Sequence, residues 1–134
     1  MRDCYEGPQA AEARSWESAV QWLRAQPSME QVVRESYLGE DVVAEAARYG
    51  ASEEFRATCR LLGADRLPAS ARILDLGAGN GIAAAAFARL GHEVVALDPD
   101  ESATVGLRAV RAMSASLRLG CLRCCCGFAQ RLPF

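Results

Sequence analysis

The sequence has no lysine, a single histidine and no long apolar run. All fifteen basic residues are arginine and the net charge is −2, which argues against nucleic acid as the main partner. The longest apolar run, Ile82 to Ala88, is far shorter than the ~20 residues of a membrane span, so we expect no membrane partner. The polar segment from Met1 to Pro8 does not resemble a signal peptide. We therefore expect a cytoplasmic chain. We also expect a single hydrophobic core, since 134 residues are too few for two.

Cysteine is plentiful, and six of these residues in a cytosolic chain should be reduced. Four of them cluster near the C-terminus and include a C-x-x-C pattern: Cys121, Cys124, Cys125 and Cys126. A structural zinc site needs a second ligand pair, and His92, the only histidine, is predicted to lie at the opposite end of the sheet. We therefore predict no metal site and favour a buried strand of small side chains, while the role of the cluster stays open.

A buried strand, a glycine-rich turn and a helix are predicted in succession from Arg72 onward. Residues 73–76 are mostly apolar, as is typical of a parallel strand covered on both faces. Glycine is needed where φ is positive or where a ligand approaches closer than a Cβ would permit, and the turn has three: Gly77, Gly79 and Gly81. The segment from Ile82 to Leu90 favours a helix, which Gly91 ends. This succession predicts the first half of a nucleotide-binding unit.

The spacing of these glycines distinguishes two kinds of nucleotide ligand. A dinucleotide fingerprint needs its third glycine where Ile82 stands. Asp75 precedes the first glycine by two residues, where its carboxylate would repel a pyrophosphate and attract a cation. Asp98 ends the next predicted strand, Glu93 to Leu97, about 20 residues after the first glycine, where an acidic residue meets a ribose diol. An NAD(P)-binding oxidoreductase is thus the less favoured alternative.

These residues resemble the class I S-adenosylmethionine-dependent methyltransferases. The resemblance rests on three segments, I-L-D-L-G-A-G-N-G from Ile73, V-V-A-L-D-P from Val94 and G-F-A-Q-R-L-P-F from Gly127. It spans slightly under half of the chain. It implies an α/β fold with a Rossmann-like, doubly wound parallel sheet, S-adenosyl-L-methionine as the cofactor, and methyl transfer to an acceptor that is a small molecule or otherwise unknown.

The resemblance also assigns cofactor-binding roles to individual residues. Asp75 and the glycine turn would lie along the methionine part, Asp98 would hold the ribose, and Pro99 would pack beside the adenine. Phe128 and Ala129 would reach the adenine edge, although the family often has an aspartate where Phe128 stands. The full set is Asp75, Gly77, Ala78, Gly79, Gly81, Asp98, Pro99, Phe128 and Ala129. The sequence identifies no catalytic base.

Residues 1–70 are predicted to form a helical cap or extension of four helices. The expected helices run from Gln9 to Gln26, from a capping box of Ser28 and Gln31 to near Gly39, from Glu40 to Tyr49, and from a cap at Ser52. In the resembled family such segments often cover the cofactor. Tyr37, Tyr49 and Phe55 are therefore candidates for lining a pocket, but we favour core positions for them and for Trp16 and Trp22.

Residues 71–134 are predicted to form an S-adenosylmethionine-binding half-domain, truncated after its third strand. A second crossover helix is expected from Glu101 to Ala115 and a third strand from Leu117 to Cys126. Right-handed crossovers then give the strand order 3-2-1. This order leaves an apolar edge open on the first strand. We therefore expect that the isolated chain is marginally stable, self-associates through this edge, or is a fragment of a longer product. A catalytically inactive binding module that uses this edge is the second alternative.

Overall fold

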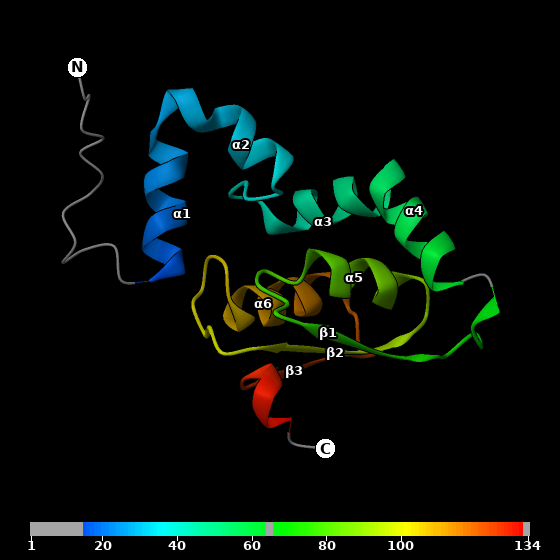
Figure 1. The fold of residues 1–134 in the computed structure, drawn as a ribbon. Helices are drawn as coiled ribbons and strands as arrows, with labels where there is room; N and C mark the ends of the chain where they lie inside the picture. The colour runs from blue at the N-terminus through cyan, green and yellow to red at the C-terminus, as the bar shows by residue number, and fades with distance from the viewer. Residues whose placement is uncertain (1–14, 64–65, 133–134) are drawn as a thin grey trace.

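The computed structural model describes residues 15–63 and 66–132 and shows helices followed by an α/β unit (Figure 1). The N-terminal elements are α1 (Trp16–Ala25), the 3₁₀ turn η1 (Pro27–Met29), α2 (Glu30–Glu35), α3 (Val42–Gly50) and α4 (Glu53–Leu62). The second part consists of β1 (Arg72–Leu76), α5 (Ile82–Arg89), β2 (Glu93–Asp98), α6 (Leu107–Leu117), β3 (Leu122–Cys126) and the 3₁₀ turn η3 (Ala129–Arg131). The predictions for residues 1–14, 64–65 and 133–134 lie outside the described residues.

The three strands form one parallel sheet in the order β1-β2-β3, which is the predicted 3-2-1 order. In this register Asp75 pairs with Ala96, and Asp98 pairs with Cys126. Figure 1 shows α5 and α6 on one side of the sheet and η3 on the other. The predicted α/β class with a partial Rossmann-like sheet is confirmed. Because the strands are parallel, the loops after them meet at one edge, where such sheets bind ligands.

The helical segment and the sheet share one hydrophobic core, and α5 lies at its centre. Residues 84–88 of α5 are all buried, and their alanines let α3 pack close to this helix. Aromatic rings continue the core: Tyr49 lies 5.4 Å from Phe55, which lies 5.0 Å from Phe87 between ring centroids. The core positions favoured for Tyr49 and Phe55 are confirmed, whereas the same expectation for Trp16 is wrong because its side chain is 51% exposed.

The second predicted helix is wrong at both ends. Ser28 lies within η1 and does not cap α2, whose N-cap residue Met29 makes no side-chain capping hydrogen bond. The helix ends at Glu35, well before Gly39. Tyr37 then takes a left-handed conformation, with φ of 55°, which cannot continue a right-handed helix. The residues from Ser36 to Gly39 form a turn rather than helix.

The second crossover helix and the third strand are shorter than predicted. The helix α6 begins at Leu107, because Gly106 is extended, with φ of −118° and ψ of −164°, and the residues before it form a loop. The strand β3 begins at Leu122 and not at Leu117, which is the last residue of α6. Arg118 follows in a left-handed conformation that ends the helix. The loop before Gly106 lies beside Gly79 of the glycine turn.

Two serines provide a direct test of the helix caps. The Ser52 side chain accepts a hydrogen bond from Phe55 N–H at 3.0 Å and caps α4 as predicted, whereas Ser28 caps no helix. We expect Ser52→Ala to lower the free energy of unfolding by about 1 kcal/mol. The matched control Ser28→Ala should change it by less than about 0.5 kcal/mol. Urea unfolding of both variants measures the difference, and equal losses would contradict this assignment of the caps.

The strand β1 has one hydrogen-bonded neighbour, β2, and no described strand pairs with its other edge. Leu76, at the end of β1, is 52% exposed. Self-association through this edge stays a prediction. None of the helices in residues 15–63 and 66–132 is long and apolar enough to cross a membrane.

Candidate functional site

The loops that follow the three strands meet around Asp98, the last residue of β2. After β1, the N–H groups of Gly77 and Ala78 both donate to the carbonyl of Leu97, at 2.9 and 3.2 Å. After β3, Gly127 N–H donates to the carbonyl of Asp98 at 3.1 Å. The three segments that carry the predicted site residues are therefore neighbours at the carboxyl edge of the sheet.

The Asp98 carboxylate is buried and fixes the glycine turn. Its Oδ2 accepts from Gly79 N–H at 2.8 Å, and its Oδ1 accepts from Asp100 N–H at 2.8 Å. An ionised carboxylate has about four lone-pair sites. Two backbone donors therefore leave room for further hydroxyl or amine donors. Asp98 holds the turn and keeps acceptor capacity beyond these two bonds.

The three glycines of the turn all have positive φ, of 71° at Gly77, 54° at Gly79 and 74° at Gly81. At Gly77 a side chain would meet nothing within 4 Å, so the backbone there is open to a ligand. At Gly81 an added Cβ would lie 2.7 Å from the Cγ2 of Val110 on α6. Gly81 is thus required by the packing of α5 on α6. The turn combines an open start with a tightly packed end.

Asp75, near the end of β1, has one buried oxygen without a partner. Its Oδ2 finds no hydrogen-bond partner in the described part of the chain. Burial raises the pKa of this carboxyl, a hydrogen bond from Ala84 N–H lowers it, and the charge of Asp98 raises it further; the net direction is upward. A buried acceptor without a donor is costly. An ammonium group of a ligand would satisfy this oxygen and favour its ionised form.

Pro99, Phe128 and Ala129 form the outer part of this edge, and all three are exposed. The Phe128 side chain is 59% exposed and directly precedes η3, which begins at Ala129. The Sγ of Cys126 lies 3.9 Å from the carbonyl oxygen of Pro99, so the end of β3 and the residue after β2 are in contact. The exposed Phe128 ring, two residues after the end of β3, suits contact with a flat ligand.

Sequence reasoning missed two contributors to this site. The first is Asn80, which is 8% exposed and contacts the N-terminal helical segment. The second is the loop before Gly106, where the carbonyl of Val105 lies 3.6 Å from the position of a Cβ on Gly79. Glu17 of α1 fixes this loop by accepting from Thr104 N–H at 2.9 Å. No local pattern reveals these contacts, because their partners lie far apart in the sequence.

Two of the clefts that lie outside the predicted set adjoin α6 or the loop before it. One, of about 530 Å³, lies between α1, the start of α3 and the loop before Gly106, and its charged lining residues are Arg24 and Glu40. Thr104 lines it too, which places it close to the glycine turn. The other, of about 470 Å³, is lined by residues of α6 and by the start of β3. It lies toward the amino end of β3, away from the edge where the three loops meet.

The cysteines of the C-terminal cluster are free thiols placed along and just before β3. Cys124 is partly buried and packs against the hydrophobic core, as expected for a strand of small side chains. Burial raises the pKa of the Cys124 thiol, so its reactive thiolate form is disfavoured. Within residues 15–63 and 66–132, no three histidine, cysteine or acidic side chains gather to hold a metal ion.

No protein-family model and no curated protein matches this chain. Among solved structures, the chain is similar to the YcgJ protein from Bacillus subtilis, with 22% identity and a TM-score of 0.49, over 59% of this chain and 32% of that one. It is also similar to the PH0226 protein from Pyrococcus horikoshii OT3, with 26% identity and a TM-score of 0.48, over 63% of this chain and 37% of the other. The chain thus spans well under half the length of either protein.

Proposed function

We propose that this chain binds S-adenosylmethionine at the carboxyl edge of its sheet and contributes the cofactor-binding part of a methyltransferase. The observation that carries the proposal is the pair of carboxylates on either side of the glycine turn. Asp75 has a buried oxygen without a partner, and Asp98 is held by two backbone donors with acceptor capacity left. A ligand that carries both an ammonium group and a ribose diol complements this pair.

Different residues of this edge would contact different parts of the cofactor. Asp75 would receive the α-amino group, and the first turn of α5 would face the α-carboxylate, because a helix N-terminus favours negative charge. Asp98 would accept from the ribose hydroxyls. Pro99 and Phe128 would pack on the adenine, with the backbone at Ala129 at its edge. When bound, S-adenosylmethionine supplies an activated methyl group.

The chain's own contribution to the reaction would be orientation. Fixing two reactants in one geometry is worth effective molarities of ~10⁵ M or more, so a site can accelerate transfer without a strong base. The glycine turn is fixed by three hydrogen bonds to β2, through Leu97 and Asp98, and can hold a ligand in one pose. The acceptor is not specified by these residues.

The raised pKa of Asp75 makes the proposed binding depend on pH. An ammonium group beside this carboxyl favours its ionised form, so below the raised pKa a proton must leave when the ligand binds. We expect the affinity for S-adenosylhomocysteine to rise with pH until the raised pKa of Asp75 is passed and then to level off. Asp75→Asn should bind more weakly and lose this dependence. Calorimetry in buffers of different ionisation enthalpy measures the proton release, and a flat profile in the unchanged chain contradicts the role of Asp75.

Calorimetric titration with S-adenosylmethionine, S-adenosylhomocysteine and NADH tests the proposal against the alternatives. We expect saturable heat with both sulfur nucleosides and none with NADH. In the structure Ile82 begins α5 where a dinucleotide fingerprint needs glycine, which disfavours NADH. Binding of NADH alone would instead support an oxidoreductase fragment. Binding of none of the three would favour a non-enzymatic module.

A further inference from the structure

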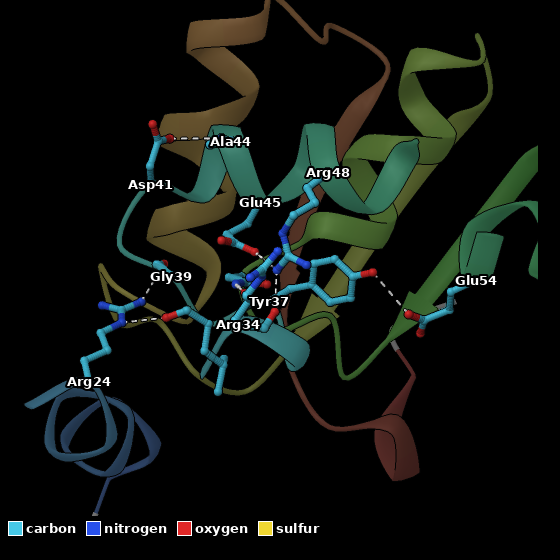
Figure 2. Close-up of polar contacts among 11 residues, drawn as sticks. Arg24, Arg34, Tyr37, Gly39, Asp41, Ala44, Glu45, Arg48 and Glu54 are labelled. Atoms are coloured by element: carbon cyan, nitrogen blue, oxygen red, sulfur yellow. Dashed lines mark hydrogen bonds and ion pairs between the residues drawn. The ribbon is translucent and has the colours of Figure 1, made fainter. Parts of the chain in front are cut away.

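The turn from Ser36 to Gly39 connects α2 to α3 and is held from several sides (Figure 2). Arg24 of α1 donates from Nε to the carbonyl of Leu38 at 2.6 Å and from its terminal nitrogen to the carbonyl of Gly39 at 2.9 Å. Both bonds come from one guanidinium. They fix the second half of the turn against α1.

The first half of the turn is held by the side chain of Tyr37. The Arg48 guanidinium lies 4.1 Å from the centre of the Tyr37 ring and also donates to the backbone carbonyl of Arg34 and to the Glu45 carboxylate. The Tyr37 hydroxyl donates to Glu54 at 3.3 Å. These contacts hold the Tyr37 backbone in its left-handed conformation, which a non-glycine residue adopts at a cost. The direction of the Tyr37 carbonyl is thereby determined by the packing around it.

The Tyr37 carbonyl accepts a hydrogen bond from a side chain of the glycine turn. Asn80 Nδ2 donates to the Tyr37 carbonyl at 3.1 Å, across 43 residues of sequence. Asn80 lies between Gly79, which bonds to Asp98, and Gly81, which packs on Val110. Its buried amide therefore joins a well-held turn of the helical segment to the backbone that faces the candidate site.

We propose that Asn80 is a positioning residue that fixes the glycine turn in its binding conformation by anchoring it to the turn 36–39. The inference rests on the proposed function and adds a role for the helical segment, which would pre-set the site without touching the ligand. A glycine-rich turn has many accessible conformations, and holding it in one lowers the ordering cost of binding. Because coupling is reciprocal, a bound ligand should in turn stabilise the turn 36–39.

The test combines affinity with amide hydrogen exchange in the full chain. We expect Asn80→Ala to weaken S-adenosylhomocysteine binding about tenfold, which corresponds to the loss of one buried hydrogen bond. In the free protein, exchange at the Gly79 and Gly81 amides should become about tenfold faster. Ser114→Ala, which removes a hydrogen bond to the Leu119 carbonyl near the C-terminal end of α6, is the control and should leave both quantities unchanged. A general loss of stability would change the affinity and the exchange rates of both variants alike.

A second variant weakens the support of the turn 36–39, which carries the Tyr37 carbonyl that Asn80 contacts. Arg24→Ala removes the support of Leu38 and Gly39 while leaving every group of the glycine turn in place. We expect it to weaken S-adenosylhomocysteine binding about threefold, and the double variant with Asn80→Ala to bind no more weakly than Asn80→Ala alone. In the unchanged chain, the ligand should slow exchange at the amides of residues 36–39, and Asn80→Ala should abolish this slowing.

The outcomes separate this inference from the proposed function. Unchanged affinity and unchanged exchange at Gly79 and Gly81 in Asn80→Ala would overturn the positioning role while the proposed function stands. If the unchanged chain binds no sulfur nucleoside, the proposed function fails. The exchange of the free protein then still decides whether Asn80 holds the turn, with faster exchange supporting it and equal exchange overturning it.

Discussion

Asp98→Ala is expected to weaken S-adenosylmethionine binding about 100-fold or more. Hydrogen bonds to a charged group are worth about 1.5–3 kcal/mol each, and two ribose hydroxyls would lose their acceptor together. The substitution also releases the Gly79 and Asp100 N–H groups, which loosens the glycine turn. Calorimetry well below the unfolding midpoint measures the change in affinity, so that the folded fraction stays constant.

Two further variants separate the carboxylate from general damage to this edge. Asp98→Asn keeps one oxygen acceptor but loses the charge, so its affinity should fall between those of the unchanged chain and Asp98→Ala. Asp100→Ala removes a neighbouring carboxylate that accepts from Ser102 N–H at 2.7 Å and leaves Asp98 in place. It should change the affinity by less than about threefold, because Asp100 N–H still donates to Asp98. Equal binding by Asp98→Ala and the unchanged chain would show that Asp98 does not contribute to binding the ligand.

Gly106→Ala is expected to have the largest effect on stability, lowering the free energy of unfolding by about 3 kcal/mol. The Gly106 backbone is extended, so its conformation alone does not demand glycine. An added Cβ, however, would clash with the carbonyl of Asp100 and lie 2.6 Å from Ser102 N. Both are backbone atoms, which cannot rotate away. The loop between Asp98 and α6 would have to move, and it lies against the glycine turn.

Gly120→Ala is the matched control, because an added Cβ at Gly120 would meet nothing within 4 Å. We expect it to change the free energy of unfolding by less than about 0.5 kcal/mol. Thermal and urea unfolding of the two variants test the comparison. Equal stabilities would show that the loop before Gly106 can rearrange freely, and the described fit of this loop against Gly79 would then be wrong.

The features that sequence reasoning placed correctly depend on local patterns. The apolar run at β1, the alternate glycines and the alanine-rich α5 are each set by neighbouring residues, and so is the capping of α4 by Ser52. The strand order follows from the right-handed crossover rule. The convergence of the predicted segments around Asp98 follows from these elements, since the carboxyl ends of parallel strands share one edge.

The features that it missed depend on contacts between distant residues. Tyr37 ends α2 early because packing with Arg48 and Glu54 holds it in a left-handed conformation. The loop before Gly106 replaces the predicted first turns of α6 because Glu17 and the glycine turn fix it there. Helical propensity alone favours the longer helices, and tertiary contacts override it. Asn80 was missed because its partner lies 43 residues away.

The most direct test of the central claim is to map S-adenosylhomocysteine onto the chain by amide chemical shifts. Our account predicts that the shifts concentrate at the glycine turn 77–81, at Asp98 and Asp100, and at residues 127–129, with smaller changes at the turn 36–39. Shifts confined to the cleft between α6 and β3, or no shifts at saturating nucleoside, would contradict a sulfur-nucleoside site at the carboxyl edge of this sheet.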